Sequence, residues 1–300
     1  MRLLIAASLV AVLAGCGTGS GVLAPVAPPA APSAAPSTSG PPAAPAPAIT
    51  GTAPAQRYQV RATDEVFQRG DRTLRTRIWA PVASGQKFPV IVFSHGLRGL
   101  PADYTSLLSR WAAAGFVIAA PAYPFTNRNA PSFEITDVLN QPADASYVLD
   151  QVLAKRTDVL PDRLAAAGHS GGGVTTIGLF TVSRDQRLRA GIVLAGTSLG
   201  VGLGFAGPPA PLLYVHGEAD DVVAYEAGRA AFEATPWPRA LLRLPGAGHG
   251  EPYLRASSPE FGATAATTLD FLRYTLYGDA AARSRLPADA EPAGVLEDKL

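Results

Sequence analysis

Several largely apolar runs alternate with segments in which apolar residues recur at helical spacing. The runs are residues 88–93, 116–121, 190–195, 211–217 and 240–244. The helical segments are residues 103–114, 137–154, 225–234 and 262–277. A short apolar run is typical of a parallel strand that helices cover on both faces. The alternation therefore predicts an α/β fold, with a mostly parallel, twisted sheet of about eight strands and helices on both faces.

The segment between residues 58 and 87 and the one after residue 277 are more polar than the runs between them. Residues 58–61 and 75–81 alternate polar and apolar side chains, which is typical of half-exposed strands, and a turn at residues 70–72 separates them. The tail from Gly278 onward is polar, and we expect it to pack loosely against the domain.

The first residues have the composition of an export signal. Arg2 precedes an apolar stretch, residues 3–13, that is too short to span a bilayer. The segment ends in Leu-Ala-Gly followed by Cys16, which resembles the lipobox of bacterial lipoproteins. The resemblance implies that residues 1–15 are a lipoprotein signal peptide, that Cys16 is lipidated, and that the protein is an exported, membrane-anchored lipoprotein of the cell envelope. An ordinary secretory signal with a stray cysteine is the alternative.

Residues 16–55 contain no charged side chain and are rich in proline and alanine. Such a composition offers no apolar periodicity from which a core could form. We expect a disordered tether there, followed by a catalytic domain over residues 56–300.

The overall composition excludes several classes of function. The net charge of +1 gives no electrostatic basis for binding nucleic acid. Cys16 is the only cysteine, and four scattered histidines make no ligand cluster, so we expect neither an intrachain disulfide nor a metal site. No phosphate-binding loop or dinucleotide motif precedes a helix, and we expect no cofactor.

Residues 168–172 fit the pattern G-x-S-x-G between a strand-like run and a segment able to open a helix. This arrangement resembles the nucleophile elbow of the α/β-hydrolases, and Ser170 would then be the nucleophile. The same pattern recurs at residues 196–200, around Ser198. The residues that follow this second copy are too rich in glycine and proline to form a helix, so we interpret Ser198 as a loop residue.

A serine nucleophile needs a base and an acid, which follow it in that superfamily in the order acid, then histidine. His249 lies in a glycine-rich loop after the last predicted strand and is the expected base. Asp220, Asp221 and Glu218 all follow the preceding strand. The family run H-G-x-x-D-x-V-V implies that Asp220 is the acid, with Asp221 as the alternative and Glu218 less favoured.

An oxyanion hole needs two N–H groups near the nucleophile. The expected donors are the backbone groups of Gly171, directly after the serine, and Leu97, in the loop after residues 88–93. The nearby His95 is expected to order that loop through a hydrogen bond, with a direct catalytic role as the less favoured alternative.

These motifs, in this order, resemble the group of α/β-hydrolases that contains chlorophyllases, platelet-activating-factor acetylhydrolases and cutinase-like polyester hydrolases. The resemblance covers residues 58–277. It implies a serine hydrolase, monomeric in its catalytic domain, that cleaves small-molecule or lipid esters through an acyl-enzyme intermediate. A serine peptidase of the prolyl-oligopeptidase type, a dienelactone-hydrolase-like activity and a non-catalytic surface lipoprotein remain alternatives.

Overall fold

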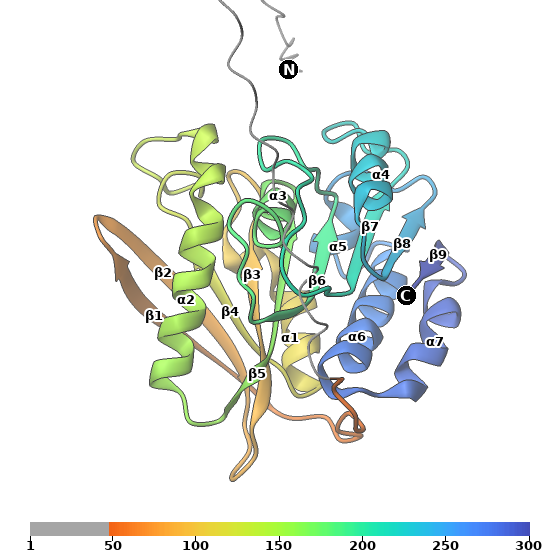
Figure 1. The fold of residues 1–300 in the computed structure, drawn as a ribbon, viewed down its shortest axis with the longest axis horizontal. Coiled ribbons are helices and arrows are strands. Elements are labelled where there is room, and N and C mark those ends of the chain that lie inside the picture. Colours follow the sequence, from red (N-terminus) through yellow and green to blue (C-terminus); the bar gives the residue numbers. More distant parts are fainter. Residues whose placement is uncertain (1–47) are drawn as a thin grey trace, which may run out of the picture. The chain divides into compact units, whose positions relative to one another are not determined.

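The computed structural model describes residues 48–300; the expected signal peptide, Cys16 and most of the expected tether lie outside the described residues. One nine-stranded sheet runs through this part of the chain in the order β1-β2-β4-β3-β5-β6-β7-β8-β9 (Figure 1). Its strands are β1 (Val60–Arg69), β2 (Arg72–Pro81), β3 (Phe88–Ser94), β4 (Val117–Ala122), β5 (Val159–His169), β6 (Leu188–Leu194), β7 (Leu212–Gly217), β8 (Arg239–Leu244) and β9 (Val295–Lys299). From β4 to β8 all neighbouring strands are parallel, whereas β1, β2 and β9 pair antiparallel.

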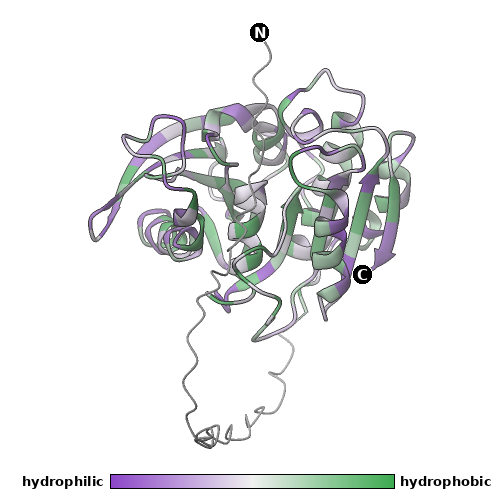
Figure 2. Cartoon of the chain, turned by 90° about the horizontal axis from the view of Figure 1, so that it is seen from above, coloured by the Kyte–Doolittle hydropathy of each residue, from purple (hydrophilic) through white to green (hydrophobic). Residues whose placement is uncertain are grey.

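Helices cover both faces of this sheet. One face carries α1 (Thr105–Ala113), α5 (Glu251–Leu254), α6 (Phe261–Tyr277) and α7 (Ala280–Ala290). The other carries α2 (Gln141–Lys155), α3 (Gly171–Gly178) and α4 (Tyr225–Ala234). Hydrophobic residues concentrate on the strands and on the helix faces turned toward them (Figure 2). The predicted α/β-hydrolase architecture is therefore confirmed.

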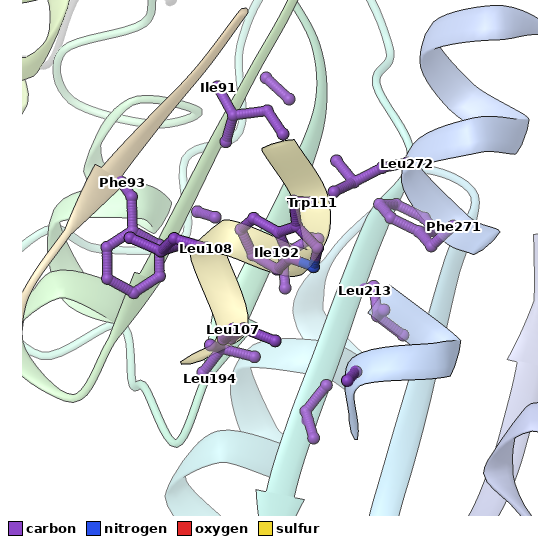
Figure 3. Close-up of a cluster of buried hydrophobic side chains, with 14 of the residues drawn as sticks. Ile91, Phe93, Leu107, Leu108, Trp111, Ile192, Leu194, Leu213, Phe271 and Leu272 are labelled. Atoms are coloured by element: carbon purple, nitrogen blue, oxygen red, sulfur yellow. The ribbon is translucent and has the colours of Figure 1, made fainter. Parts of the chain in front are cut away.

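The packing of α1 explains why its sequence has helical spacing of apolar residues. Leu107, Leu108 and Trp111 are fully buried. Figure 3 shows them between side chains of the sheet and of α6. The labelled neighbours are Ile91, Phe93, Ile192, Leu194, Leu213, Phe271 and Leu272. Burying large apolar side chains on both sides of the strands is the main source of stability for such a layered fold.

The prediction of a loosely packed tail is wrong. Asp279 caps α7 by accepting hydrogen bonds from the backbone N–H groups of Ala281 and Ala282. Leu286 and Ala290 of that helix are buried. Strand β9 then pairs with β8 along its whole length. The tail contributes few apolar side chains, but they fall at helical spacing on the face that meets the core.

The second predicted helix starts later than expected. Residues 135–139 form a separate 3-10 helix, η2 (Ile135–Leu139), and α2 begins at Gln141. Pro142 occupies the first turn of α2, where its missing N–H leaves no helical hydrogen bond unmade.

The described end of the expected tether contacts the domain. Ala53 is buried, and its N–H donates a hydrogen bond to the Asp279 carboxylate at 3.3 Å. Within residues 48–300, no helix combines the length and the apolar character that crossing a membrane requires.

Candidate active site

Ser170 lies on the turn that joins β5 to α3. Its backbone has φ 57° and ψ −120°, a region that residues with a side chain rarely adopt. A Cβ on Gly168 would come within 2.1 Å of the Gly172 carbonyl oxygen, and one on Gly172 within 2.0 Å of the Ser94 carbonyl oxygen. Both glycines are thus required by close backbone approach, which lets the turn project the Ser170 side chain from the end of the strand.

The structure brings Ser170 together with His249 and Asp220. His249, in the loop between β8 and α5, has its Nε2 atom 2.8 Å from Ser170 Oγ. Its Nδ1 atom lies 2.8 Å from Asp220 Oδ2, in the loop after β7. The carboxylate can only accept, so His249 Nδ1 carries the hydrogen and Nε2 is free to accept the Ser170 proton.

Asp220 is held as a carboxylate although its side chain is buried. Its Oδ1 atom accepts the N–H groups of Val222 and Val223 at 2.9 and 2.8 Å. Burial disfavours the charge, but the hydrogen bonds from His249 and from these two N–H groups outweigh it and lower the pKa of Asp220.

The two other candidate acids occupy different surroundings. Asp221 is exposed to solvent. Glu218 pairs with Arg243 at 3.0 Å on the surface. Only Asp220 among the three lies within hydrogen-bond distance of the His249 ring.

The two expected oxyanion donors lie side by side. A Cβ on Gly171 would be 3.5 Å from the Leu97 nitrogen and 3.0 Å from Leu97 Cγ. Within residues 48–300, neither the Leu97 N–H nor the Gly171 N–H donates a hydrogen bond to another group. Two unpaired N–H groups beside a serine hydroxyl are the arrangement that can bind a developing negative charge on oxygen.

The second G-x-S-x-G copy has no such geometry. The Ser198 carbonyl accepts the N–H groups of Val201 and Gly202, which makes a tight turn, and no helix follows it before α4 in the described chain. Ser198 is a loop residue, as its sequence context predicts.

Comparison with known proteins supports the fold and the class of enzyme. A model of the chlorophyllase family matches residues 50–195. The dog (Canis lupus familiaris) platelet-activating factor acetylhydrolase is 27% identical over 188 residues, which cover 46% of this chain and 42% of the relative. The guinea-pig (Cavia porcellus) and cattle (Bos taurus) enzymes of that name are 25% and 27% identical, with the same coverage. These similarities support an α/β-hydrolase of the esterase group.

The chain matches well under half the length of these curated relatives. The family match includes Leu97, Ser170 and Gly171 but ends before Asp220 and His249. The roles expected of Asp220 and His249 therefore rest on chain order and on the geometry described above.

The other three histidines surround the site, and burial lowers the pKa of each. His95 donates from Nδ1 to the Gly96 carbonyl at 2.8 Å and accepts the Tyr123 N–H at 3.1 Å. It thereby orders the loop that carries Leu97. His216 donates from Nε2 to the Val223 carbonyl at 2.9 Å and lies 3.3 Å from Asp220 Oδ2.

The described chain has two sizeable surface cavities, and one of them borders the candidate site. One, of about 670 Å³, is lined by the His249 loop, Asp221 and residues 258–260. The other, of about 730 Å³, lies between the β1–β2 hairpin, residues 100–102 and the loop after β4.

Residues 48–300 contain no cluster of three or more histidine, aspartate or glutamate side chains suited to a metal ion.

Proposed function

We propose that the protein hydrolyses carboxylic esters through an acyl-enzyme intermediate on Ser170. One observation carries the proposal: the Ser170 hydroxyl, the His249 ring and the Asp220 carboxylate form a continuous hydrogen-bonded chain with two contacts of 2.8 Å. A nucleophile, a base and an acid in this arrangement are the requirements of serine acyl transfer.

In the first half of the reaction, His249 Nε2 takes the Ser170 Oγ proton as Oγ attacks the ester carbonyl carbon. The carbonyl oxygen becomes negative and is bound by the N–H groups of Leu97 and Gly171. The ester C–O bond then breaks, and the alcohol leaves with the proton returned from Nε2. Asp220 stabilises the transient imidazolium because its pKa keeps it ionised at neutral pH.

In the second half, water replaces the alcohol. His249 Nε2 takes a water proton, the hydroxide adds to the acyl carbon, and the same N–H groups bind the oxyanion. The acyl–Oγ bond breaks, Ser170 regains its proton, and the carboxylic acid is released.

Ser170→Ala tests this proposal on p-nitrophenyl esters from acetate to palmitate, which also define the acyl length accepted. The variant should fold like the parent and lose activity by roughly 10⁴-fold or more. Ser198→Ala is the matched control and should keep full activity. Retained activity in Ser170→Ala would exclude Ser170 as the nucleophile, and loss of activity in Ser198→Ala would point to the second serine.

We also propose that the enzyme acts from a membrane surface, on small-molecule or lipid esters, with Cys16 as the lipid-bearing residue. The support is the lipobox-like sequence and the uncharged proline-rich segment after it. Two or more acyl chains give stable anchoring, at about 0.8 kcal/mol per buried CH₂. Cys16→Ser should move the protein from the membrane fraction to the soluble fraction and leave its specific activity unchanged. A wild-type protein that is soluble and unmodified at Cys16 would refute the anchor.

A further inference from the structure

His169, the residue before the nucleophile, is enclosed by aromatic rings. Only 4% of its surface is exposed. The rings of Tyr253 and His249 lie 4.9 and 4.8 Å from its own, and that of Tyr104 lies 5.8 Å away. Its two ring nitrogens nevertheless both have polar partners, so its role is more specific than filling the core.

These partners fix the position of every hydrogen in a four-group chain. The His249 carbonyl, 2.7 Å from His169 Nε2, can only accept, so Nε2 carries a hydrogen. The Gly96 N–H can only donate, and it does so to the Tyr104 hydroxyl oxygen at 3.0 Å. The Tyr104 hydrogen is then directed at His169 Nδ1, 2.8 Å away, which accepts it.

This chain connects three parts of the active site. Gly96 precedes Leu97, the expected oxyanion donor, and a Cβ on Gly96 would lie 3.2 Å from the Ser170 Cβ. The other end is the main chain of His249, the expected base. We infer that His169 is a positioning residue that, with Tyr104, holds the oxyanion loop and the His249 loop in fixed relation to Ser170. This inference rests on the proposed function.

The protonation states of both groups suit this role. Burial, reinforced by the neighbouring His249, lowers the pKa of His169 to about 3, so its ring stays neutral. Burial raises the pKa of Tyr104, so the phenol keeps its hydrogen. A neutral His169 can face the His249 ring when that ring becomes positive during acyl transfer, whereas a protonated one would repel it.

The experiment compares Tyr104→Phe with Tyr214→Phe in the full-length protein. Tyr214 is also a buried phenol with one short hydrogen bond, to Thr235 at 2.6 Å, but it lies outside the site. We expect Tyr104→Phe to lower kcat for p-nitrophenyl butyrate on the order of 10- to 100-fold with KM nearly unchanged, because oriented groups lose rate when slightly misplaced. Tyr214→Phe should keep the parent kcat, although it loses a comparable hydrogen bond.

Variants of His169 separate the two halves of the chain. His169→Asn keeps an acceptor near the Nδ1 position, and His169→Gln keeps a donor near the Nε2 position. Each should retain more activity than His169→Phe, and combining Tyr104→Phe with His169→Phe should add less than about twofold to the loss from either alone.

Two results would overturn the inference. One is a kcat for Tyr104→Phe equal to that of Tyr214→Phe, and the other is a fully multiplicative loss in the double variant. If either occurs while Ser170→Ala is inactive, the proposed function stands and only the positioning role fails. An active Ser170→Ala would instead remove the proposed function itself.

Discussion

Replacing Asp220 with asparagine should reverse the hydrogen bonding of His249 without disturbing the fold. The Val222 and Val223 N–H groups bind Oδ1, so they will hold the amide oxygen of an asparagine in that place. The amide NH₂ group must then occupy the position of Oδ2, facing His249 Nδ1 at 2.8 Å and His216 at 3.3 Å. His249 Nδ1 is forced to become an acceptor, and the hydrogen moves to Nε2, where it faces Ser170.

The expected cost follows from that tautomer change. A histidine with hydrogen on Nε2 cannot take the Ser170 proton, and the corresponding substitution in a serine protease lowers kcat by about 10⁴-fold. This corresponds to roughly 5.5 kcal/mol of transition-state stabilisation. The steric fit is unchanged, so the thermal midpoint should shift far less than kcat.

The assay is kcat and KM on p-nitrophenyl butyrate for the parent, Asp220→Asn and Asp221→Asn, with a thermal melt of each. Asp221 is exposed, and the carboxylate that binds the His249 ring is that of Asp220, so the Asp221 variant is the matched control and should resemble the parent. A kcat for Asp220→Asn within about tenfold of the parent would refute the assigned tautomer, as would a larger loss in Asp221→Asn.

Three further predictions concern stability. Arg72→Gln should cost about 3–5 kcal/mol in a urea titration, because Arg72 pairs with two buried carboxylates, Asp137 and Asp144, and only Asp144 keeps a second cationic partner, Arg69. Arg77→Gln, which breaks an exposed ion pair, should cost about 1 kcal/mol or less. Gly172→Ala should lose about 3 kcal/mol or fail to fold, because of the overlap of its Cβ with backbone; a normally stable variant would contradict the geometry of the turn. Burial and a neighbouring carboxylate raise the pKa of Asp289 to about 6, above its unfolded value. The stability that protonated Asp289 contributes is therefore lost as the pH rises through about 6. Asp289→Asn should melt higher than the parent at about pH 8 but not at about pH 4.

The sequence predicts the fold well because most of its central strands contain a continuous apolar run. Residues 88–93 and 190–195 are buried on both faces, and their composition reflects that environment directly. The prediction for the tail from Gly278 fails because α7 and β9 contribute only a narrow buried stripe, and because β9 pairs through its backbone, which side-chain composition does not reveal.

The candidate site also has one part that the sequence predicts and one part that only the structure shows. The glycines around Ser170 can be recognised in the sequence because backbone crowding excludes a Cβ at Gly168 and Gly172. Tyr104 falls in residues 103–114, which the sequence predicts only as a helix, and its partner His169 lies 65 residues away. No local pattern reports a contact of that sequence separation, so the chain of hydrogen bonds behind the nucleophile could be found only in the structure.

The central claim is that Ser170 is the residue that becomes acylated. Titration with a fluorophosphonate ester tests it most directly, since the activated serine oxygen displaces fluoride and stays bound to phosphorus. The account predicts one adduct per chain, on the peptide containing Ser170, with activity lost in proportion to labelling and no labelling of Ser170→Ala. Labelling at Ser198, or full activity after Ser170 is modified, would contradict it.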